Sequence, residues 1–374
     1  MKKIISNLSI ILGSLFITSC GGGGGSGGES GITRLEEIQP IYSTNYSSYA
    51  WNVNQNIDSN FKTTYNIDDN AHIHLPTNTN NQKIKVAVID ENFQPTHPDI
   101  KDKVIATYNI MNRSSNVLTS TTDFSHGTAV AGVIASTYLG VAPKNVELIL
   151  INIDLGNLIS ESYFLQAFSK AEELGARVIN CSWGGSSLSQ TLEAKIQELK
   201  NKGIVVVFSS GNGDALGNAK DLDLAGNDDE SESVFVLGVG ATSVLNDVTS
   251  YSNYGSQIDI LAPGGDSNLG VLSLDLLKDD GVNPSLNSSK VGNDLVNHNY
   301  TFTYGTSFAA PTISGVVALM LSENPNLTFD EIRTILILTS EQIGIQNGAN
   351  YSINNFDTKR AYGKVNATGA INAL

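Results

Sequence analysis

The sequence lacks the cysteines that a disulfide framework would need. Its 374 residues contain only Cys20 and Cys181, so an internal disulfide would have to join these two. If Cys20 carries another modification, no internal disulfide is possible, and the fold must depend on the size of its core. Cys181 is then expected to be a small, buried hydrophobic side chain.

Basic residues are also scarce. The 22 Lys and Arg are outnumbered by 37 Asp and Glu, which gives a formal net charge of −15. Such acidity favours solubility and argues against a phosphate-binding surface, so we do not expect nucleic acid as a partner. No apolar run long enough to span a membrane follows residue 20.

The first 31 residues are predicted to export and tether the chain. A basic start at 1–3 and a short apolar run at 4–17 have the form of a secretory signal. The sequence Ile-Thr-Ser-Cys at 17–20 resembles a bacterial lipobox, which implies removal of residues 1–19 and a lipid on Cys20. Residues 20–31 then form a Gly-rich tether. We expect a membrane-anchored lipoprotein of the bacterial cell envelope, at the outer membrane, on its periplasmic or its surface face.

Residues 32–82 are rich in Asn, Ser, Thr and Tyr and show no sustained period. They are predicted to form an irregular N-terminal wrap. His72 and His74 could be metal ligands on one face of a strand, but no cysteine or second cluster supports this interpretation. We expect a solvated strand or loop there instead.

Strand-like and helix-like segments alternate from residue 83 onward. Such alternation predicts a three-layer α/β domain, in which helices cover both faces of a mostly parallel sheet. Residues 101–122 and 266–300 are polar and are expected to be loops. The predicted strands lie at 84–90, 146–154, 178–185, 203–212, 234–241 and 258–264, and the predicted helices at 126–135, 160–174, 189–201, 306–321 and 328–340.

Ser307 stands between a glycine-led turn and a run of small and apolar residues that predicts a buried helix. The dipole and the free N–H groups of a helix N-terminus favour negative charge, and a nucleophile needs that environment. Taken alone, the sequence Gly-Thr-Ser at 305–307 is more typical of a helix cap. The nucleophile interpretation therefore depends on other residues.

Three further residues stand at the end of a predicted strand or the start of a predicted helix. Asp90 ends the first strand, His126 opens a helix of small residues, and Asn212 ends another strand. Acyl transfer needs such a set, because a histidine must take the serine proton and a carboxylate must orient the imidazole. An amide N–H can then donate to the developing oxyanion.

The motifs around these residues resemble those of the subtilisin-like serine proteases, the subtilases. The order Asp, His, Ser along the chain is that of the family, and the resemblance extends from about residue 84 to residue 340. The motifs are Ile-Asp at 89–90, His-Gly-Thr-Ala-Val-Ala-Gly at 126–132, Ser-Gly-Asn at 210–212 and Gly-Thr-Ser-Phe-Ala-Ala-Pro at 305–311.

The resemblance implies a peptidase domain over 83–374 that acts as a serine endopeptidase. Ser307 would be the nucleophile, His126 the general base and Asp90 its orienting carboxylate, with Asn212 in the oxyanion hole. Protein or peptide substrates would lie as an added strand. The residues implied to bind them are Ser182, Trp183, Gly184 and Gly211.

The sequence departs from the family pattern at two places. Glu91 and Asn92 follow the acid where relatives have a small residue and then glycine; asparagine tolerates the left-handed conformation, so the turn is expected to persist. Many relatives bind calcium through an acid like Asp99 and a longer loop after the histidine helix. Residues 136–140 are too short for that loop, so we predict that this calcium site is absent and that no cofactor is needed.

Other functions on the same fold stay open at this point. A non-catalytic binding or adhesin module of the cell envelope is the main alternative, although an intact set of four site residues argues against it. An esterase or peptide ligase would share the acyl-enzyme and differ only in the acceptor. Neither the substrate nor the oligomeric state follows from the sequence.

Overall fold

A parallel seven-stranded sheet forms the centre of the computed structural model, with strand order β2-β3-β1-β4-β5-β6-β7. The structure describes residues 46–374 apart from 121–124, 156–159, 185–187, 215, 225, 228, 278–280, 282–295, 297 and 298. The strands are β1 (Ile84–Asp90), β2 (Val104–Asn109), β3 (Val146–Asn152), β4 (Val178–Cys181), β5 (Val205–Ser209), β6 (Leu237–Thr242), β7 (Ile260–Pro263), β8 (Val271–Leu274) and β9 (Tyr300–Thr303). The helices are η1 (Tyr46–Tyr49), α1 (Ser59–Tyr65), α2 (His126–Ala135), α3 (Glu161–Glu173), α4 (Gln190–Asn201), η2 (Glu230–Glu232), α5 (Thr306–Glu323), α6 (Phe329–Thr339), η4 (Ile345–Asn347) and α7 (Ala367–Asn372).

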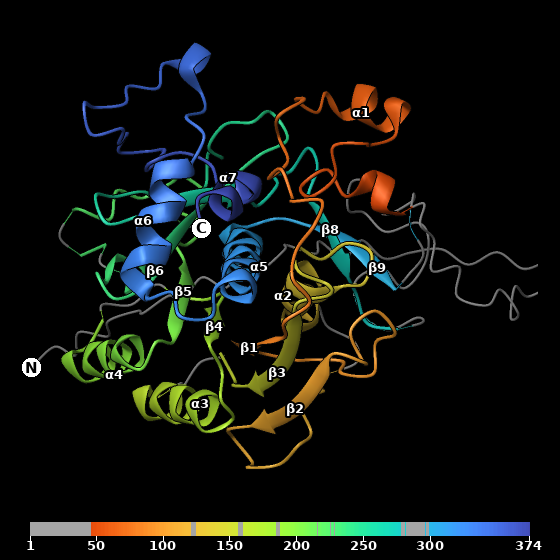
Figure 1. Ribbon diagram of the computed structural model, residues 1–374, viewed down its shortest axis with the longest axis vertical. Helices are drawn as coiled ribbons and strands as arrows, with labels where there is room; N and C mark the ends of the chain where they lie inside the picture. Colours follow the sequence, from red (N-terminus) through yellow and green to blue (C-terminus); the bar gives the residue numbers. More distant parts are fainter. Residues whose placement is uncertain are drawn as a thin grey trace, which may run out of the picture.

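Alternate residues of the central strands face two separate cores. In β1, Val86 and Val88 belong to one hydrophobic cluster, whereas Ala87 and Ile89 belong to the other. This follows from the two-residue period of a strand. Figure 1 shows α2 and α5 on one side of the sheet and α3 and α4 on the other. The predicted three-layer α/β architecture is therefore confirmed.

Helix α5 is buried on almost every side. Of its 18 residues, 16 are buried, and it packs against α2, β1 and the four strands β4 to β7. Small residues allow this close approach: a Cβ on Gly315 would lie 2.6 Å from Val141 Cβ, and one on Gly132 of α2 would lie 2.5 Å from Ser273 Oγ. Because their residues are small and apolar, α2 and α5 can pack closely against each other. This packing brings the N-termini of the two helices near each other.

The carboxyl ends of neighbouring parallel strands meet at one edge of the sheet. β1 pairs in parallel with β4, and β4 pairs in parallel with β5. Asp90 ends β1, residues 182–184 follow β4, and Asn212 follows β5. Ligand and catalytic groups of open parallel sheets collect at such an edge.

Two of the predicted loop regions contain strands. β2 lies inside 101–122, and the antiparallel pair of β8 and β9 lies inside or just after 266–300. The prediction was wrong here because β2 is an edge strand with half-exposed side chains. The hairpin strands have only four residues each, which is too short for a clear period.

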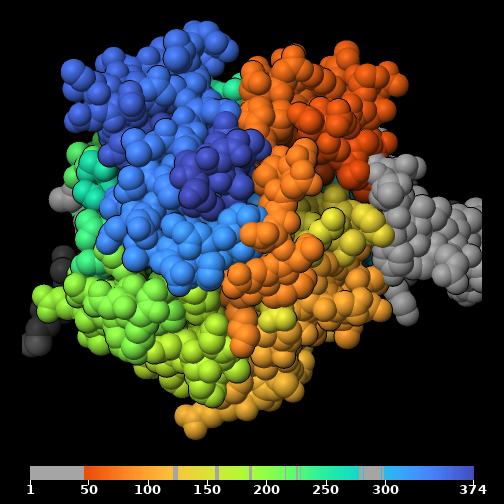
Figure 2. Space-filling view, viewed as in Figure 1, coloured from red at the N-terminus to blue at the C-terminus, as the bar shows by residue number. Residues whose placement is uncertain are grey.

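The N-terminal wrap shares the main hydrophobic core. Trp51, Phe61 and Ile73 are buried and belong to the same cluster as α2 and α5. Trp51 Nε1 donates to the carbonyl of Gly270 at 2.8 Å, and Ala367 N donates to the carbonyl of Ile73 at 2.9 Å. In Figure 2 the orange wrap lies directly against the blue C-terminal residues.

His72 differs from the expectation for this segment. Its side chain is buried rather than solvated, and its ring lies 4.1 Å from that of His74. Burial, together with the positive charges of His74 and Lys364, lowers the pKa of His72 to about 4. His74 instead pairs with Glu341 at 3.1 Å. Among the residues outside the gaps given above, no group of three or more His, Cys, Asp or Glu could hold a metal ion.

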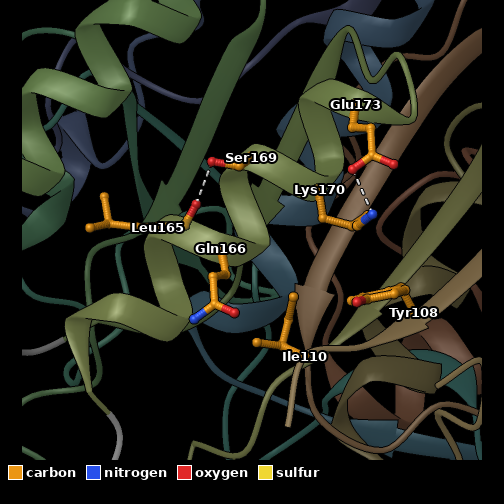
Figure 3. Close-up of a pocket in the computed structure, with 7 residues that line it drawn as sticks. All are labelled: Tyr108, Ile110, Leu165, Gln166, Ser169, Lys170 and Glu173. Carbon is orange, nitrogen blue, oxygen red and sulfur yellow. Dashed lines mark hydrogen bonds and ion pairs between the residues drawn. The ribbon is translucent and has the colours of Figure 1, made fainter. Parts of the chain in front are cut away.

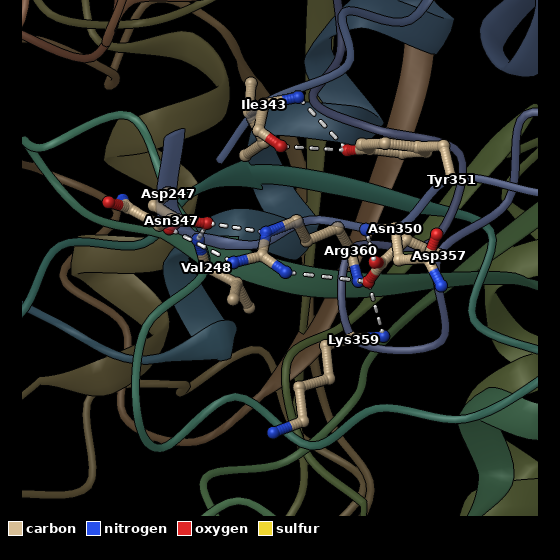
Figure 4. A network of polar contacts seen from close by, with 9 residues as sticks. All are labelled: Asp247, Val248, Ile343, Asn347, Asn350, Tyr351, Asp357, Lys359 and Arg360. Atoms are coloured by element: carbon tan, nitrogen blue, oxygen red, sulfur yellow. Dashed lines mark hydrogen bonds and ion pairs between the residues drawn. The ribbon is translucent and has the colours of Figure 1, made fainter. Parts of the chain in front are cut away.

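A polar network fixes the C-terminal segment to the body of the domain (Figure 4). Arg360 Nε donates to Asp247 Oδ1 at 2.8 Å, and Arg360 Nη2 donates to Asp247 Oδ2 at 3.2 Å. This paired geometry suits a guanidinium and a carboxylate. The charge of Arg360 and its hydrogen bonds hold the pKa of Asp247 below its usual value, although burial acts in the opposite direction.

In the part of the chain that the structure describes, no helix has both the length and the apolar composition needed to cross a bilayer.

We predict that Trp51→Ala destabilises the whole domain. The indole is 1% exposed, and its removal should lower the free energy of unfolding by about 3–5 kcal/mol. Urea denaturation followed by circular dichroism measures this change. Ile353→Ala, at a side chain that is 99% exposed, serves as the control and should leave stability unchanged. An equally small effect for Trp51→Ala would show that the wrap is not part of the cooperative core.

Candidate active site

Asp90 and His126 form a close pair at the edge of the sheet. Asp90 ends β1 and is fully buried, and His126 is the first residue of α2. The distance from His126 Nδ1 to Asp90 Oδ1 is 2.7 Å, and the main-chain N–H of Glu91 donates to the same oxygen at 2.7 Å. With Nδ1–H held by the carboxylate, Nε2 of a neutral imidazole is the basic nitrogen.

The turn after Asp90 keeps the geometry that the dyad needs. Asn92 has a left-handed φ of 56°, as expected for an asparagine in this place. Its Oδ1 accepts from the main-chain N–H of Thr119 at 3.0 Å and of Ser120 at 3.1 Å. The main-chain carbonyl of Glu91 accepts from Gly127 N at 2.9 Å. The turn is therefore connected directly to the first turn of α2.

Glu91 adds a second carboxylate beside the dyad. Burial, and then the neighbouring charge of Asp90, raise the pKa of Glu91 above its usual value, while the charge of His126 acts in the opposite direction. The interaction between Glu91 and His126 is reciprocal, so an ionised Glu91 favours a protonated imidazole. The electrostatic environment of the histidine thus differs from one that contains Asp90 alone.

Ser307 is the second residue of α5, directly after Gly305 and Thr306. Its Oγ donates to the carbonyl of Ser182 at 3.0 Å. The ring of the next residue, Phe308, lies 5.6 Å from the ring of His126. The packing of α5 on α2 therefore brings the residue next to Ser307 beside the histidine ring.

A chain of hydrogen bonds fixes the first turn of α5 to β4. Ser182 Oγ donates to the carbonyl of Ser307 at 2.7 Å. Asn180 Nδ2 donates to Ser182 Oγ, and Ser314 Oγ donates to Asn180 Oδ1, both at 2.9 Å. Asn180 and Ser314 are fully buried. We did not identify these positioning residues from the sequence, because only the packing of α5 on β4 brings them together.

Asn212 is held in one orientation by Thr306. Its Oδ1 accepts from both the main-chain N–H and the Oγ1 hydroxyl of Thr306, each at 2.9 Å. Since a main-chain N–H can only donate, the atom that faces it must be the amide oxygen. Asn212 Nδ2 is therefore the end of the amide that can donate to a substrate. It lies 3.3 Å from the position that a Cβ on Gly305 would take.

The predicted substrate-binding residues flank Ser307. Ser182 touches it directly, and Gly211 N donates to Thr306 Oγ1 at 3.2 Å. The side chain of Trp183 packs inward, because its Nε1 donates to the carbonyl of Ile89 at 2.7 Å and its ring stacks on Phe164 at 4.4 Å. Trp183 can thus offer only its main chain to an added strand.

Gly211 must be glycine for two reasons. Its φ is 87°, and a Cβ would lie 2.6 Å from Asn253 Nδ2. The chain can therefore make its close turn into Asn212 only without a side chain at this position.

Two other residues singled out in the sequence, Cys181 and Asp99, are buried, as is the nearby His97. Cys181 is fully buried in β4, and burial raises the pKa of its thiol well above the usual value. His97 is also buried, and its Nδ1 accepts from Asp99 N at 3.2 Å. The carboxylate of Asp99 accepts from Ser136 Oγ at 2.8 Å and from Tyr300 Oη at 3.3 Å. The absence of the calcium site stays a prediction, and Cys20 lies outside the described residues.

A hollow on the surface lies between β2 and α3 (Figure 3). Its lining includes Tyr108 and Ile110 on one side and Leu165 and Lys170 on the other. Lys170 Nζ lies 4.6 Å from the centre of the Tyr108 ring and pairs with Glu173 at 2.6 Å. None of the four predicted catalytic residues belongs to this lining, so the hollow is separate from the candidate site.

Comparisons with known proteins agree with this geometry. The model of the subtilase family matches residues 81–367. The chain is 30% identical to subtilisin DY of Bacillus licheniformis, over 70% of this chain and 85% of that protein. It is 28% identical to the thermophilic serine proteinase of Bacillus sp. strain AK1, over 77% of this chain and 61% of that protein.

The fold has a match among solved structures. The serine protease of Aeromonas sobria, solved in a complex with a chaperone, superimposes with a TM-score of 0.68. The match covers 78% of this chain and 60% of that one, at 22% identity. At this identity the likeness concerns the fold.

We predict that Glu91→Gln shifts the acid limb of the reaction at Ser307 to lower pH. The substitution removes a negative charge that favours the protonated, unreactive imidazole, so the midpoint should fall by about half a pH unit. The measurement is the rate of labelling by a fluorophosphonate between pH 5 and pH 9. Glu91→Asp keeps the charge, so its midpoint should lie close to that of the native protein. An unchanged midpoint in Glu91→Gln would exclude the interaction between Glu91 and His126.

Proposed function

The chain belongs to the subtilase family of serine proteases, and on this premise we propose that it cleaves peptide bonds within proteins through an acyl-enzyme on Ser307. The observation that carries the proposal is the contact of 2.7 Å between His126 Nδ1 and Asp90 Oδ1, near the first turn of α5, which contains Ser307. The chain spans about 61% of the length of one Bacillus relative and 85% of another, so its activity and its substrates are proposals.

The first half of the reaction forms the acyl-enzyme. Ser307 Oγ leaves the carbonyl of Ser182 and attacks the substrate carbonyl carbon, while its proton passes to His126 Nε2. Asp90 stabilises the imidazolium without taking the proton itself. The scissile C–N bond then breaks, and His126 gives the same proton to the leaving amine.

The second half repeats these steps with water. His126 Nε2 takes a proton from water as the water oxygen attacks the acyl carbon, and the bond to Ser307 Oγ breaks as the proton returns to the serine. In both halves the negative oxygen accepts a hydrogen bond from Asn212 Nδ2, whose direction is fixed by Thr306. A fixed donor is effective because it does not have to reorganise during the reaction.

Labelling by a fluorophosphonate probe separates this proposal from a non-catalytic module. We expect one probe per chain, located on Ser307 by peptide mass spectrometry, together with cleavage of an unfolded protein such as casein. Ser307→Ala should lose both. Ser169→Ala, at an exposed hydroxyl of α3, is the control for labelling specificity and should keep the label. An unlabelled, folded protein would favour the binding or adhesin function.

We predict that Asn212→Ala slows turnover with little change in KM. The substitution removes a donor that acts on the transition state, so kcat should fall by about 10²- to 10³-fold; this magnitude is the one known for the corresponding donor of subtilisin. Steady-state kinetics with a peptide substrate measures it. An increase in KM at constant kcat would instead show that Asn212 contributes to ground-state binding.

We also propose that a lipid on Cys20 tethers the protease to the bacterial cell envelope, at the outer membrane. The secretory form of residues 1–17, the position of Cys20 directly after them and the Gly-rich tether support this proposal. A flexible tether would let the folded domain reach substrates near the membrane surface.

The two cysteines allow a matched test of the anchor. Labelling with radioactive palmitate and partition into detergent are expected for the native chain and for Cys181→Ala. Both properties should be lost in Cys20→Ser. A native chain that stays unlabelled, or a label that persists in Cys20→Ser, would contradict lipidation at this residue.

A further inference from the structure

Two buried carboxylates lie behind the main chain that flanks Ser307. Asp229 and Glu230 are 4% and 2% exposed, and Glu230 opens the short helix η2, which packs against β5 and β6. They belong to an acidic stretch at 214–232 whose composition is typical of a solvated loop. Their burial is therefore an observation that the sequence alone does not explain.

The carboxylates face two glycines of the candidate active site. A Cβ on Gly184 would lie 3.2 Å from both carboxylate oxygens of Asp229 and 3.3 Å from Glu230 Oε2. A Cβ on Gly211 would lie 3.9 Å from Asp229 Oδ2. Gly184 ends the segment that begins with Ser182, and Gly211 precedes Asn212. Asp229 therefore lies between the two main-chain segments that border the reacting atoms, and Glu230 lies beside the first of them.

The buried carboxyl group of Asp229 has no ion-pair partner among the residues that the structure places. Its Oδ1 accepts from the main-chain N–H of Ser231 at 2.9 Å, and no Lys, Arg or His forms an ion pair with it. Burial, and then the charge of Glu230, raise the pKa of Asp229 to about 8. A buried carboxylate of this kind is stabilised strongly by a cation that enters its surroundings.

Substrate geometry indicates where such a cation would come from. A substrate carbonyl that meets Ser307 Oγ and Asn212 Nδ2 must lie between Ser182 and Asn212. The side chain of the same substrate residue can then enter the gap between Gly184 and Gly211, since neither glycine has a side chain to block it. A long side chain with a terminal positive charge would reach the two carboxylates there.

We propose that Asp229 and Glu230 select substrates with Arg or Lys at the residue whose carbonyl Ser307 attacks. This inference rests on the proposed protease function and adds the class of substrate to it. A side-chain cation fits the position better than a metal ion, because no cluster of three ligating side chains occurs among the placed residues.

The test compares peptides that differ only at the attacked residue, which is Arg, Lys, Gln or Leu. The ratio of kcat/KM for Arg over Gln should be at least about 10-fold in the native protein and should fall by about 10- to 100-fold in Asp229→Asn and in Glu230→Gln. Both substitutions keep the shape of the side chain. Asp214→Asn is the matched control, since it removes an exposed charge two residues after Asn212, and it should leave the ratio within about twofold.

The outcomes separate failure of this inference from failure of the proposed function. Cleavage of all four peptides without preference would overturn the inferred substrate class but not the protease function. The same conclusion would follow if the preference were lost in Asp214→Asn and kept in both Asp229→Asn and Glu230→Gln. A preference that disappears when a chelator is added would also overturn the inference, since it would require a metal ion. The absence of both peptide cleavage and fluorophosphonate labelling would overturn the proposed function, and the inference with it. Thermal melting of each variant shows that a changed ratio comes from folded protein.

Discussion

The burial of α5 is the constraint on which the active site depends. This helix touches β4, β5, β6 and β7, the last four strands in the order of the sheet, as well as β1 and α2. Only small residues permit such close contacts on several sides. Its N-terminus is consequently fixed at the edge where β1, β4 and β5 end. Packing therefore brings the first turn of α5 to His126, Ser182 and Asn212, while hydrogen bonds from Asn180, Ser182 and Thr306 set the final orientation.

Carboxyl groups are concentrated around this fixed helix end. Asp90 and Asp229 are buried close to the main chain that borders the site, and Glu91 lies partly buried beside Asp90. Each has a different consequence: Asp90 orients and stabilises the histidine, Glu91 adds to the charge around it, and Asp229 lies where a substrate side chain would pass. Because charges interact strongly when water is excluded, a few carboxylates can determine both the pH dependence and the substrate preference of this enzyme.

Residues near a strand end or a helix start could be predicted from the sequence, and packing-dependent features could not. The β-branched run before Asp90 and the small-residue run after Ser307 fix both elements locally, and the left-handed turn at Asn92 follows from the properties of asparagine. The inward direction of the Trp183 ring depends on Ile89, and the surroundings of His72 include Lys364, both far away in the chain. The same holds for Asp229. Its acidic neighbours in the sequence indicate an exposed loop, but the packing of η2 against β5 and β6 buries it.

The central claim is that Ser307 becomes covalently acylated during turnover. Mixing the protein with an activated ester and quenching in acid within milliseconds, followed by peptide mass spectrometry, measures this directly. We expect a burst of the released alcohol close to one equivalent per chain and an acyl group on the peptide that contains Ser307. A linear release without a burst, together with no acyl group on that peptide at any time, would contradict it.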